Sequence, residues 1–324
     1  MVAVVRFQQF GTPEVLQIEQ AAMTTPGPGE AWVEQVAIGM NYLDVMQRNG
    51  VVKVPLPSGL GLEGAGQVTA VGDGVSNVRV GDRVAYANGP LGAYASGRLY
   101  PAERLVKLPD SLSCEDAAAV MFKGLTAQYL LKSTYPVGPG TTMLLYGVAG
   151  GLGALMAQWA KQLGAFVIGV VSRAASVPRA EALGCGAVLV FDPATLAAEV
   201  GRITGGGKVD VVYDPIGRLS FEASLDSLRP RGVMVSFGAS SGVPAAVELA
   251  TLNAKGSLFL TRPSLAAHTA TIAEYQERAQ DVLAAIDSGI ITPDIWGCYA
   301  LADVASAHAD LESGRSSGAI ILRP

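Results

Sequence analysis

The spacing of hydrophobic residues divides the chain into two kinds of sequence. Up to about residue 123, short apolar runs are separated by glycine, proline and aspartate, as in Ala31–Ile38, Gly66–Val71 and Arg83–Ala87. Closely spaced runs of this length, with no helical pattern between them, predict a barrel-like or partly open β domain. The segment Gly59–Gly66 within it contains too many glycines for a helix.

After Lys123 the pattern predicts strands that alternate with helices. The expected strands are Thr142–Tyr146, Ala165–Ser172, Ala187–Phe191, Val209–Tyr213, Gly232–Phe237 and Gly256–Leu260, and the expected helices are Gly151–Leu163, Ser176–Leu183, Ala194–Ile203 and Ser220–Leu228. This alternation is typical of right-handed βαβ units, so we expect a doubly wound parallel sheet and an α/β fold class.

The end of the chain departs from this alternation. It predicts a long helix over Ala266–Ser288, a short helix near Leu301–Ser313 and a closing strand over Ala319–Leu322. We expect this segment to pack back onto the first domain. The predicted domains are therefore 1–123, completed by 263–324, and 124–262.

Composition limits the possible partners. The 324 residues carry a formal net charge of −5, so a basic surface for nucleic acid is not expected. Only 16% of residues are charged, against about 25% in typical soluble proteins. So apolar a surface is often covered by another copy of the chain, which favours an oligomer.

The cysteines and the start of the chain indicate the compartment. Cys114, Cys185 and Cys298 lie far apart without a CxxC pair, which excludes a disulfide scaffold and a thiolate zinc site. The first residues do not form an export signal. The uncharged stretch Ser133–Ala160 is long enough to span a bilayer, but its glycines and prolines favour a loop, strand, turn and helix. We expect a cytoplasmic protein with no membrane span.

A glycine-rich turn is the strongest chemical signal. Gly147-Val-Ala-Gly150-Gly151-Leu152-Gly153 lies between a predicted buried strand and a predicted helix. Glycine lets the backbone bend sharply there, and the helix N-terminus offers N–H groups to a diphosphate. The alternative is that these glycines serve close helix–strand packing alone. Together with the βα pattern, the turn predicts dinucleotide binding.

The end of the second strand of this domain indicates which dinucleotide. NAD sites usually have a carboxylate there, about 20 residues after the glycines. This chain has Ser172-Arg173 instead. A guanidinium can bind a 2′-phosphate that a carboxylate would repel, so we expect NADPH. The alternative is that Arg173 is an exposed loop cation.

Other residues offer little for catalysis. The only histidines, His268 and His308, lie in the C-terminal part without a cysteine or carboxylate at ligand spacing, and we expect surface or packing roles for them. Asp214 is either catalytic or the end of a strand that turns at the ligand-binding edge.

The chain resembles the zinc-independent quinone oxidoreductase (zeta-crystallin-like) family of the medium-chain dehydrogenases/reductases. The resemblance rests on the glycine-rich turn and on the segments Gly11–Leu16, Asn41–Asp44, Leu56–Gly66, Lys123–Ala127 and Val235–Gly242. It implies a GroES-like catalytic domain, a Rossmann domain and a homodimer. Zinc-dependent relatives have a histidine before the glutamate of the glycine-rich segment, whereas this chain has Leu62. The resemblance therefore implies no metal.

The resemblance also implies site residues. The expected catalytic residues are Asn41, Tyr42 and Lys123. The expected cofactor-binding residues are Asn41, Thr126, Gly150, Gly151, Leu152, Ser172, Arg173, Phe191, Phe237, Gly238 and Ser240. The alternatives are that Asn41 caps a turn, that Tyr42 and Phe237 are packing residues and that Lys123 precedes the helix that links the domains. Relatives often have a lysine and a tyrosine that serve the 2′-phosphate at the positions where this chain has Ser176 and Phe191. We expect Arg173 to substitute for them.

The activity implied is hydride transfer from NADPH to a quinone. Two alternatives stay open. One is reduction of a 2-alkenal, another enone or an enoyl thioester, since the same hydride can reach a β-carbon. The other is a nucleotide-regulated RNA-binding protein, although the net charge argues against it.

Overall fold

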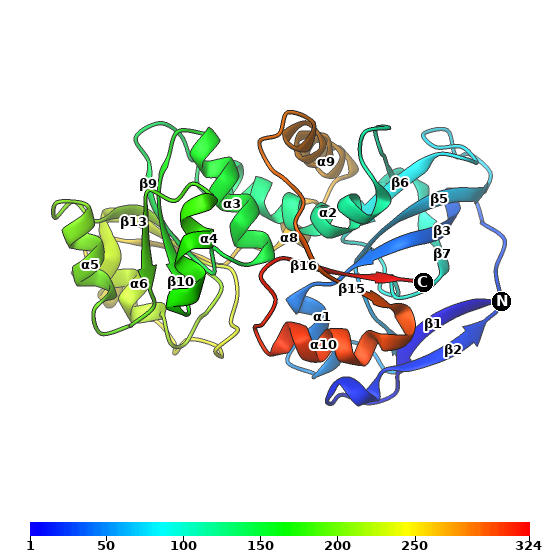
Figure 1. Cartoon of the computed structure of the whole chain (residues 1–324), viewed down its shortest axis with the longest axis horizontal. Helices are drawn as coiled ribbons and strands as arrows, with labels where there is room; N and C mark the ends of the chain where they lie inside the picture. Colours follow the sequence, from blue (N-terminus) through cyan, green and yellow to red (C-terminus); the bar gives the residue numbers. More distant parts are fainter. The chain divides into compact units, whose positions relative to one another are not determined.

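The computed structural model describes residues 1–324 and divides into two compact units (Figure 1). The first unit consists of Met1–Leu125 and Thr269–Pro324, and the second of Thr126–His268. The sequence placed the boundaries at 123/124 and 262/263 instead. No helix has the length and apolarity needed to cross a membrane.

The second unit contains a six-stranded parallel sheet in the order β11-β10-β9-β12-β13-β14. Its strands are β9 (Thr142–Tyr146), β10 (Phe166–Val171), β11 (Ala187–Val190), β12 (Val209–Asp214), β13 (Leu228–Ser236) and β14 (Phe259–Thr261). From β9 the chain first adds strands on one side and later, from β12 onward, on the other. The carboxyl ends of β9 and β12 are therefore the switch point of the sheet, where α/β proteins usually bind ligands.

Helices cover both faces of this sheet, as the predicted βα alternation requires. They are α3 (Gly151–Gln162), α4 (Val177–Ala182), α5 (Leu196–Ile203) and α6 (Phe221–Ser227). Two short helices, α7 (Leu249–Ala254) and α8 (Leu265–His268), follow later in this unit. Figure 1 shows α3 and α4 on one face of the sheet and α5 and α6 on the other. The Rossmann architecture expected from the sequence is confirmed.

The first unit is built from two sheets. β2-β1-β4 form a three-stranded sheet, and β15-β16-β3-β5-β6-β8 form the main sheet, in which β7 also pairs with β3. The strands are β1 (Val2–Phe7), β2 (Gln17–Ala21), β3 (Glu30–Gly39), β4 (Ser58–Gly59), β5 (Glu63–Val71), β6 (Arg83–Ala87), β7 (Gly97–Pro101), β8 (Val106–Lys107), β15 (Ile295–Ala300) and β16 (Ala319–Arg323). Pairing of β16 with β3 places the end of the chain inside this sheet.

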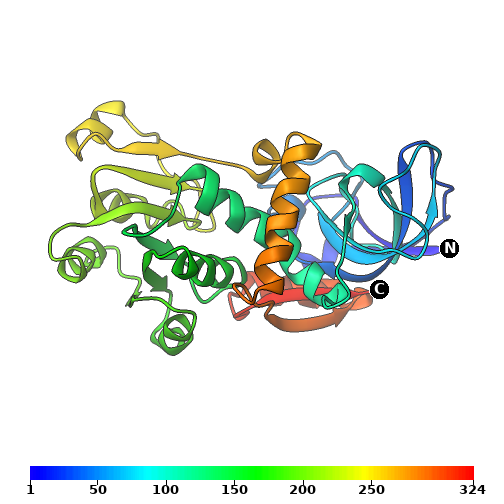
Figure 2. The ribbon, with the colours of Figure 1, turned by 90° about the horizontal axis from the view of Figure 1, so that it is seen from above.

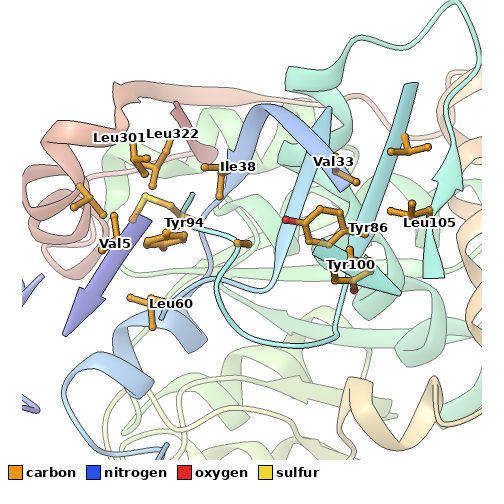
Figure 3. Packing of buried hydrophobic residues seen from close by; sticks show 14 of the residues in the cluster. Val5, Val33, Ile38, Leu60, Tyr86, Tyr94, Tyr100, Leu105, Leu301 and Leu322 are labelled. Carbon is orange, nitrogen blue, oxygen red and sulfur yellow. The ribbon is translucent and has the colours of Figure 1, made fainter. Parts of the chain in front are cut away.

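The core of the first unit unites residues from both ends of the sequence. Leu301 and Leu322 lie in one cluster with Val5 and Ile38, and Tyr94 is fully buried among them (Figure 3). Burying side chains of this size stabilises the fold by about 1.5–3 kcal/mol each. The C-terminal segment is therefore a structural part of the β-rich unit.

Three expectations about helices were wrong. The first unit contains α1 (Tyr42–Arg48) and most of α2 (Cys114–Tyr129), so its strands are not free of intervening helices, and Lys123 lies within α2 instead of before it. The predicted helix Ala266–Ser288 is interrupted: α8 ends at His268, and α9 (Ile272–Asp287) begins separately as one continuous helix (Figure 2). Thr271 caps α9, accepting a hydrogen bond from the Glu274 N–H (3.2 Å). α10 (Val304–Glu312) follows in the first unit.

Candidate functional site

The glycine-rich turn joins β9 to α3 in a very small space. Gly147 has a φ of +64°, a conformation that favours glycine. A Cβ on Gly153 would lie 2.2 Å from the Gly147 carbonyl oxygen and 2.7 Å from the Val148 Cα. Only glycine at position 153 therefore lets α3 begin directly at the end of the buried strand.

The start of α3 carries unpaired donors. The Gly150 N–H donates to the Gly147 carbonyl oxygen (2.9 Å), and the first N–H of the helix with a backbone partner belongs to Ala154, which donates to Gly150 (2.9 Å). The N–H groups of Gly151, Leu152 and Gly153 have no partner in the structure. Three open amides at the N-terminus of a twelve-residue helix form a suitable site for a phosphate anion.

Arg179 adds positive charge to this turn. Its Nε donates to the carbonyl oxygen of Ala149 at 3.0 Å, although Arg179 lies on the following helix, α4. Arg179 was not among the residues predicted from the sequence, because one arginine in a short helix does not by itself indicate a contact with the turn.

Asp214 organises the other side of the switch point. Its carboxylate is fully buried at the end of β12, where Oδ1 accepts the N–H groups of Ile216 (2.7 Å) and Gly217 (3.1 Å). Oδ2 accepts the hydroxyl groups of Ser220 (2.6 Å) and Ser224 (2.9 Å). With four donors bound, Asp214 holds the turn in place and has no capacity left for catalysis.

The other residues predicted from the sequence for the second unit gather at the same sheet edge, with one exception. Ser172 and Arg173 follow β10 and are exposed, and Phe191 follows β11, with its ring edge-to-face against Tyr146 at 5.7 Å. Phe237, Gly238 and Ser240 follow β13, where a Cβ on Gly238 would lie 2.5 Å from the Pro215 carbonyl oxygen. Thr126 is the exception, since it is buried within α2.

In the first unit, two predicted residues share one buried carboxylate. Asn41 Nδ2 donates to Glu63 Oε1 at 2.8 Å, and Lys123 Nζ donates to the same oxygen at 3.1 Å. The Phe122 N–H donates to Glu63 Oε2 at 2.7 Å. Tyr42 does not join this cluster: its side chain is exposed, and its hydroxyl has no hydrogen-bond partner. Glu63 was not among the site residues predicted from the sequence.

Behind Asn41 lies a second buried network. The Asn41 N–H donates to Asp44 Oδ2 (2.8 Å), which also accepts the Tyr94 hydroxyl (3.0 Å). The Tyr94 oxygen is 3.2 Å from His308 Nε2, and Arg48 donates to His308 Nδ1 (3.3 Å). Since Nδ1 accepts a hydrogen bond, the network assigns the proton of a neutral His308 to Nε2. His308 is thus a packing residue, as expected.

Burial shifts the pKa values of two of these groups. Burial away from water raises the pKa of Asp44 to about 7. Loss of solvent, with the charge of Arg48 alongside, lowers the pKa of His308 to about 3. Arg48 itself is compensated by Glu312, to which it donates two hydrogen bonds (2.7 and 2.9 Å).

Comparison with known proteins identifies the family. Residues 27–110 match the alcohol dehydrogenase GroES-like domain, and residues 151–284 match the zinc-binding dehydrogenase domain. The chain is 44% identical over 321 residues to a quinone oxidoreductase of Pseudomonas aeruginosa, covering 99% of both proteins. The chain belongs to the quinone oxidoreductase family of the medium-chain dehydrogenases/reductases. The resemblance inferred from the sequence is confirmed.

Two further relatives match this chain over almost its whole length. The structure of Escherichia coli quinone oxidoreductase complexed with NADPH superposes with a TM-score of 0.95 at 43% identity and covers 99% of this chain and 100% of that one. A 2-haloacrylate reductase of Burkholderia sp. is 39% identical over 332 residues, covering 100% of this chain and 99% of the relative.

The family name "zinc-binding dehydrogenase" raises the question of a metal. No group of three histidine, cysteine, aspartate or glutamate side chains lies close enough to hold a metal ion. The buried carboxylate nearest to such a role, Glu63, already accepts three hydrogen bonds, one of them from the ammonium group of Lys123. These residues do not fit a zinc ion, which requires three or four N, S or O ligands.

We expect His308 to make the stability of the protein depend on pH. Because its pKa is lower in the folded protein than in the unfolded chain, its neutral form contributes stability that is fully present above about pH 6.5 and is lost as the pH falls toward 3. The raised pKa of Asp44 has the opposite effect on stability: its contribution is lost as the pH rises from about 4 to 7. Urea unfolding of the wild type and His308→Gln between pH 7.5 and 4.5 isolates the histidine, since both proteins retain Asp44, Arg48 and Glu312.

Below pH 6.5 the difference in unfolding free energy between the two proteins should change by about 1.4 kcal/mol per pH unit, at the expense of the wild type. Parallel stability curves for the two proteins would contradict the assignment of a neutral, buried His308.

Proposed function

We propose that the chain catalyses the NADPH-dependent reduction of quinones. The proposal rests on the three unpaired N–H groups at the start of α3. They lie at the switch point of the sheet, in a member of the quinone oxidoreductase family. NADPH supplies a hydride when it is bound. The protein binds the nucleotide, orients the reactants and excludes water.

In this proposal the start of α3 holds the diphosphate. The N–H groups of Gly151 and Leu152 donate to it, and the helix dipole adds to the attraction. Gly150 has its own N–H engaged with Gly147, so it contributes close approach of the backbone.

The rest of the sheet edge binds the remainder of the nucleotide. Ser172 and Arg173 face the 2′-phosphate, and Phe191 lies on the adenosine side, where the lysine and tyrosine of many relatives are absent. For the nicotinamide half we propose Thr126, Phe237, Gly238 and Ser240. The sheet edge supports this assignment, because all of these residues except Thr126 follow its parallel strands.

Asn41 and Lys123 are the proposed reacting-site residues of the first unit. Asn41 is buried and Lys123 is half-buried, and their shared contact with Glu63 gives them fixed orientations, which is what positioning of a substrate or nicotinamide ring requires. Tyr42 stays a weaker candidate, because its exposed side chain has no contact that fixes it.

Reduction of an activated alkene is the second candidate function. It is favoured by one finding, the 39% identity to a 2-haloacrylate reductase over the whole chain. Hydride transfer to the β-carbon of such an acid or of an enone requires the same nucleotide site.

We also propose that the protein is a homodimer in the cytoplasm. β14 is an edge strand whose Phe259 and Leu260 are 61% and 37% exposed, and Figure 2 shows it, in yellow, at the border of the sheet. An apolar edge strand invites pairing with a second copy. The three cysteines are all free, as is usual in a reducing compartment.

The activity is tested by NADPH consumption with a panel of acceptors. We expect turnover with 1,4-benzoquinone or 9,10-phenanthrenequinone that exceeds turnover with 2-alkenals, 2-chloroacrylate and an enoyl-CoA. Preference for one of the alkenes would replace the first candidate function by the second. A protein that does not oxidise NADPH with any of these acceptors would refute both.

Arg173→Asp tests the choice of cofactor. Replacing a guanidinium by a carboxylate removes a charge-assisted contact to the 2′-phosphate and adds repulsion, so NADPH binding should weaken at least about tenfold while NADH binding changes little. Arg231→Asp is the matched control, because Arg231 is exposed and lies in β13 away from its carboxyl end. Equal losses for both nucleotides in calorimetric titrations would refute the contact.

Phe259→Asp tests the homodimer. A carboxylate on the exposed edge should convert a dimer to monomers in light scattering, because pairing would bury the charge. Val190→Asp on β11, the opposite edge strand, should leave the dimer intact. A monomeric wild type would refute the homodimer. A Phe259→Asp protein that stays dimeric would refute β14 as the edge at which the two copies pair.

A further inference from the structure

Glu63 is a fully buried carboxylate at the start of β5. Its two oxygens accept three hydrogen bonds, from Asn41, Lys123 and the Phe122 backbone. Burial of an ion is costly unless its partners compensate it, and here the ammonium group of Lys123 supplies the opposite charge. The three donors come from the cap of α1 and from α2, so the carboxylate joins elements that are far apart in the sequence.

A glycine on the neighbouring strand makes room for this carboxylate. Gly39 on β3 pairs with Glu63 on β5. A Cβ on Gly39 would lie 2.4 Å from Glu63 Cδ and 2.0 Å from the Ala118 carbonyl oxygen. The space that glycine vacates is therefore occupied by the carboxylate.

The two side-chain partners of Glu63 each keep a hydrogen that the protein does not use. Asn41 Nδ2 has two hydrogens and donates one, to Glu63. Lys123 Nζ has three and donates two, to Glu63 and to the Met40 carbonyl oxygen (3.0 Å). Because both nitrogens donate to the same oxygen, Oε1, the two nitrogens that carry the unused hydrogens are neighbours.

We propose that Glu63 is a positioning residue for the reduction: it fixes Asn41 and Lys123 so that their unused N–H groups donate together to the carbonyl oxygen of the substrate. This inference rests on the proposed function. Hydride transfer to a quinone or an activated alkene places negative charge on such an oxygen, and fixed donors stabilise that charge without reorganisation. The reducible substrate is thereby defined as a carbonyl compound.

The competing explanation is that the pair of Glu63 and Lys123 only holds β5 against α2. Two near-isosteric substitutions separate the two roles. Glu63→Gln leaves a buried ammonium uncompensated, and Lys123→Met leaves a buried carboxylate, so each alone should lower the melting temperature. The double variant E63Q/K123M is neutral at both positions and should regain most of the lost melting temperature.

The turnover of the double variant should not recover together with its melting temperature. We expect Glu63→Gln to lower kcat at least about tenfold, with the KM for NADPH within about twofold of the wild type. The double variant should be no more active than the weaker single variant, because both residues act as one unit.

Two results would overturn the proposal. One is a double variant whose kcat returns toward the wild-type value together with its melting temperature, which would reduce the pair to a structural role. The other is a Glu63→Gln protein with wild-type kcat. If that single variant fails to fold, the double variant decides alone. A wild type that reduces no acceptor refutes the proposed function, whereas an active wild type with an equally active double variant refutes only the role of Glu63.

Discussion

A helix that starts close to the end of a buried strand leaves no room for a side chain where the two come closest. In this chain the constraint falls on Gly153, where a Cβ would lie 2.2 Å from the Gly147 carbonyl oxygen. Because α3 begins so close to β9, its first N–H groups open at the switch point of the sheet. The position of the proposed diphosphate site therefore depends on this contact.

The sequence predicts the second unit well and the first less well. In the second unit each strand is followed by a helix of different period, so the two patterns delimit one another. In the first unit α1 has only seven residues, and its one signal is the capping box of Asn41 and Asp44. The break between α8 and α9 also had a signal, the pair Thr271 and Glu274, which a continuous amphipathic pattern obscured.

The candidate site was predictable where function depends on the backbone and less so where it depends on packing. The glycine-rich turn and Arg173 follow from position along the chain. Glu63 could not be singled out in this way, because its contacts arise from pairing of β5 with β3 and from α2, which lies about 60 residues later. Arg179 likewise reaches the turn from the next helix. Contacts between elements remote in sequence require the folded structure.

Calorimetric titration of the purified chain with NADPH tests the central claim most directly. Binding that saturates at one nucleotide per chain is the result expected if the amides at the start of α3 hold the diphosphate. Absence of any heat of binding up to millimolar NADPH would contradict the account, because the turn would then serve only the packing of α3 on β9.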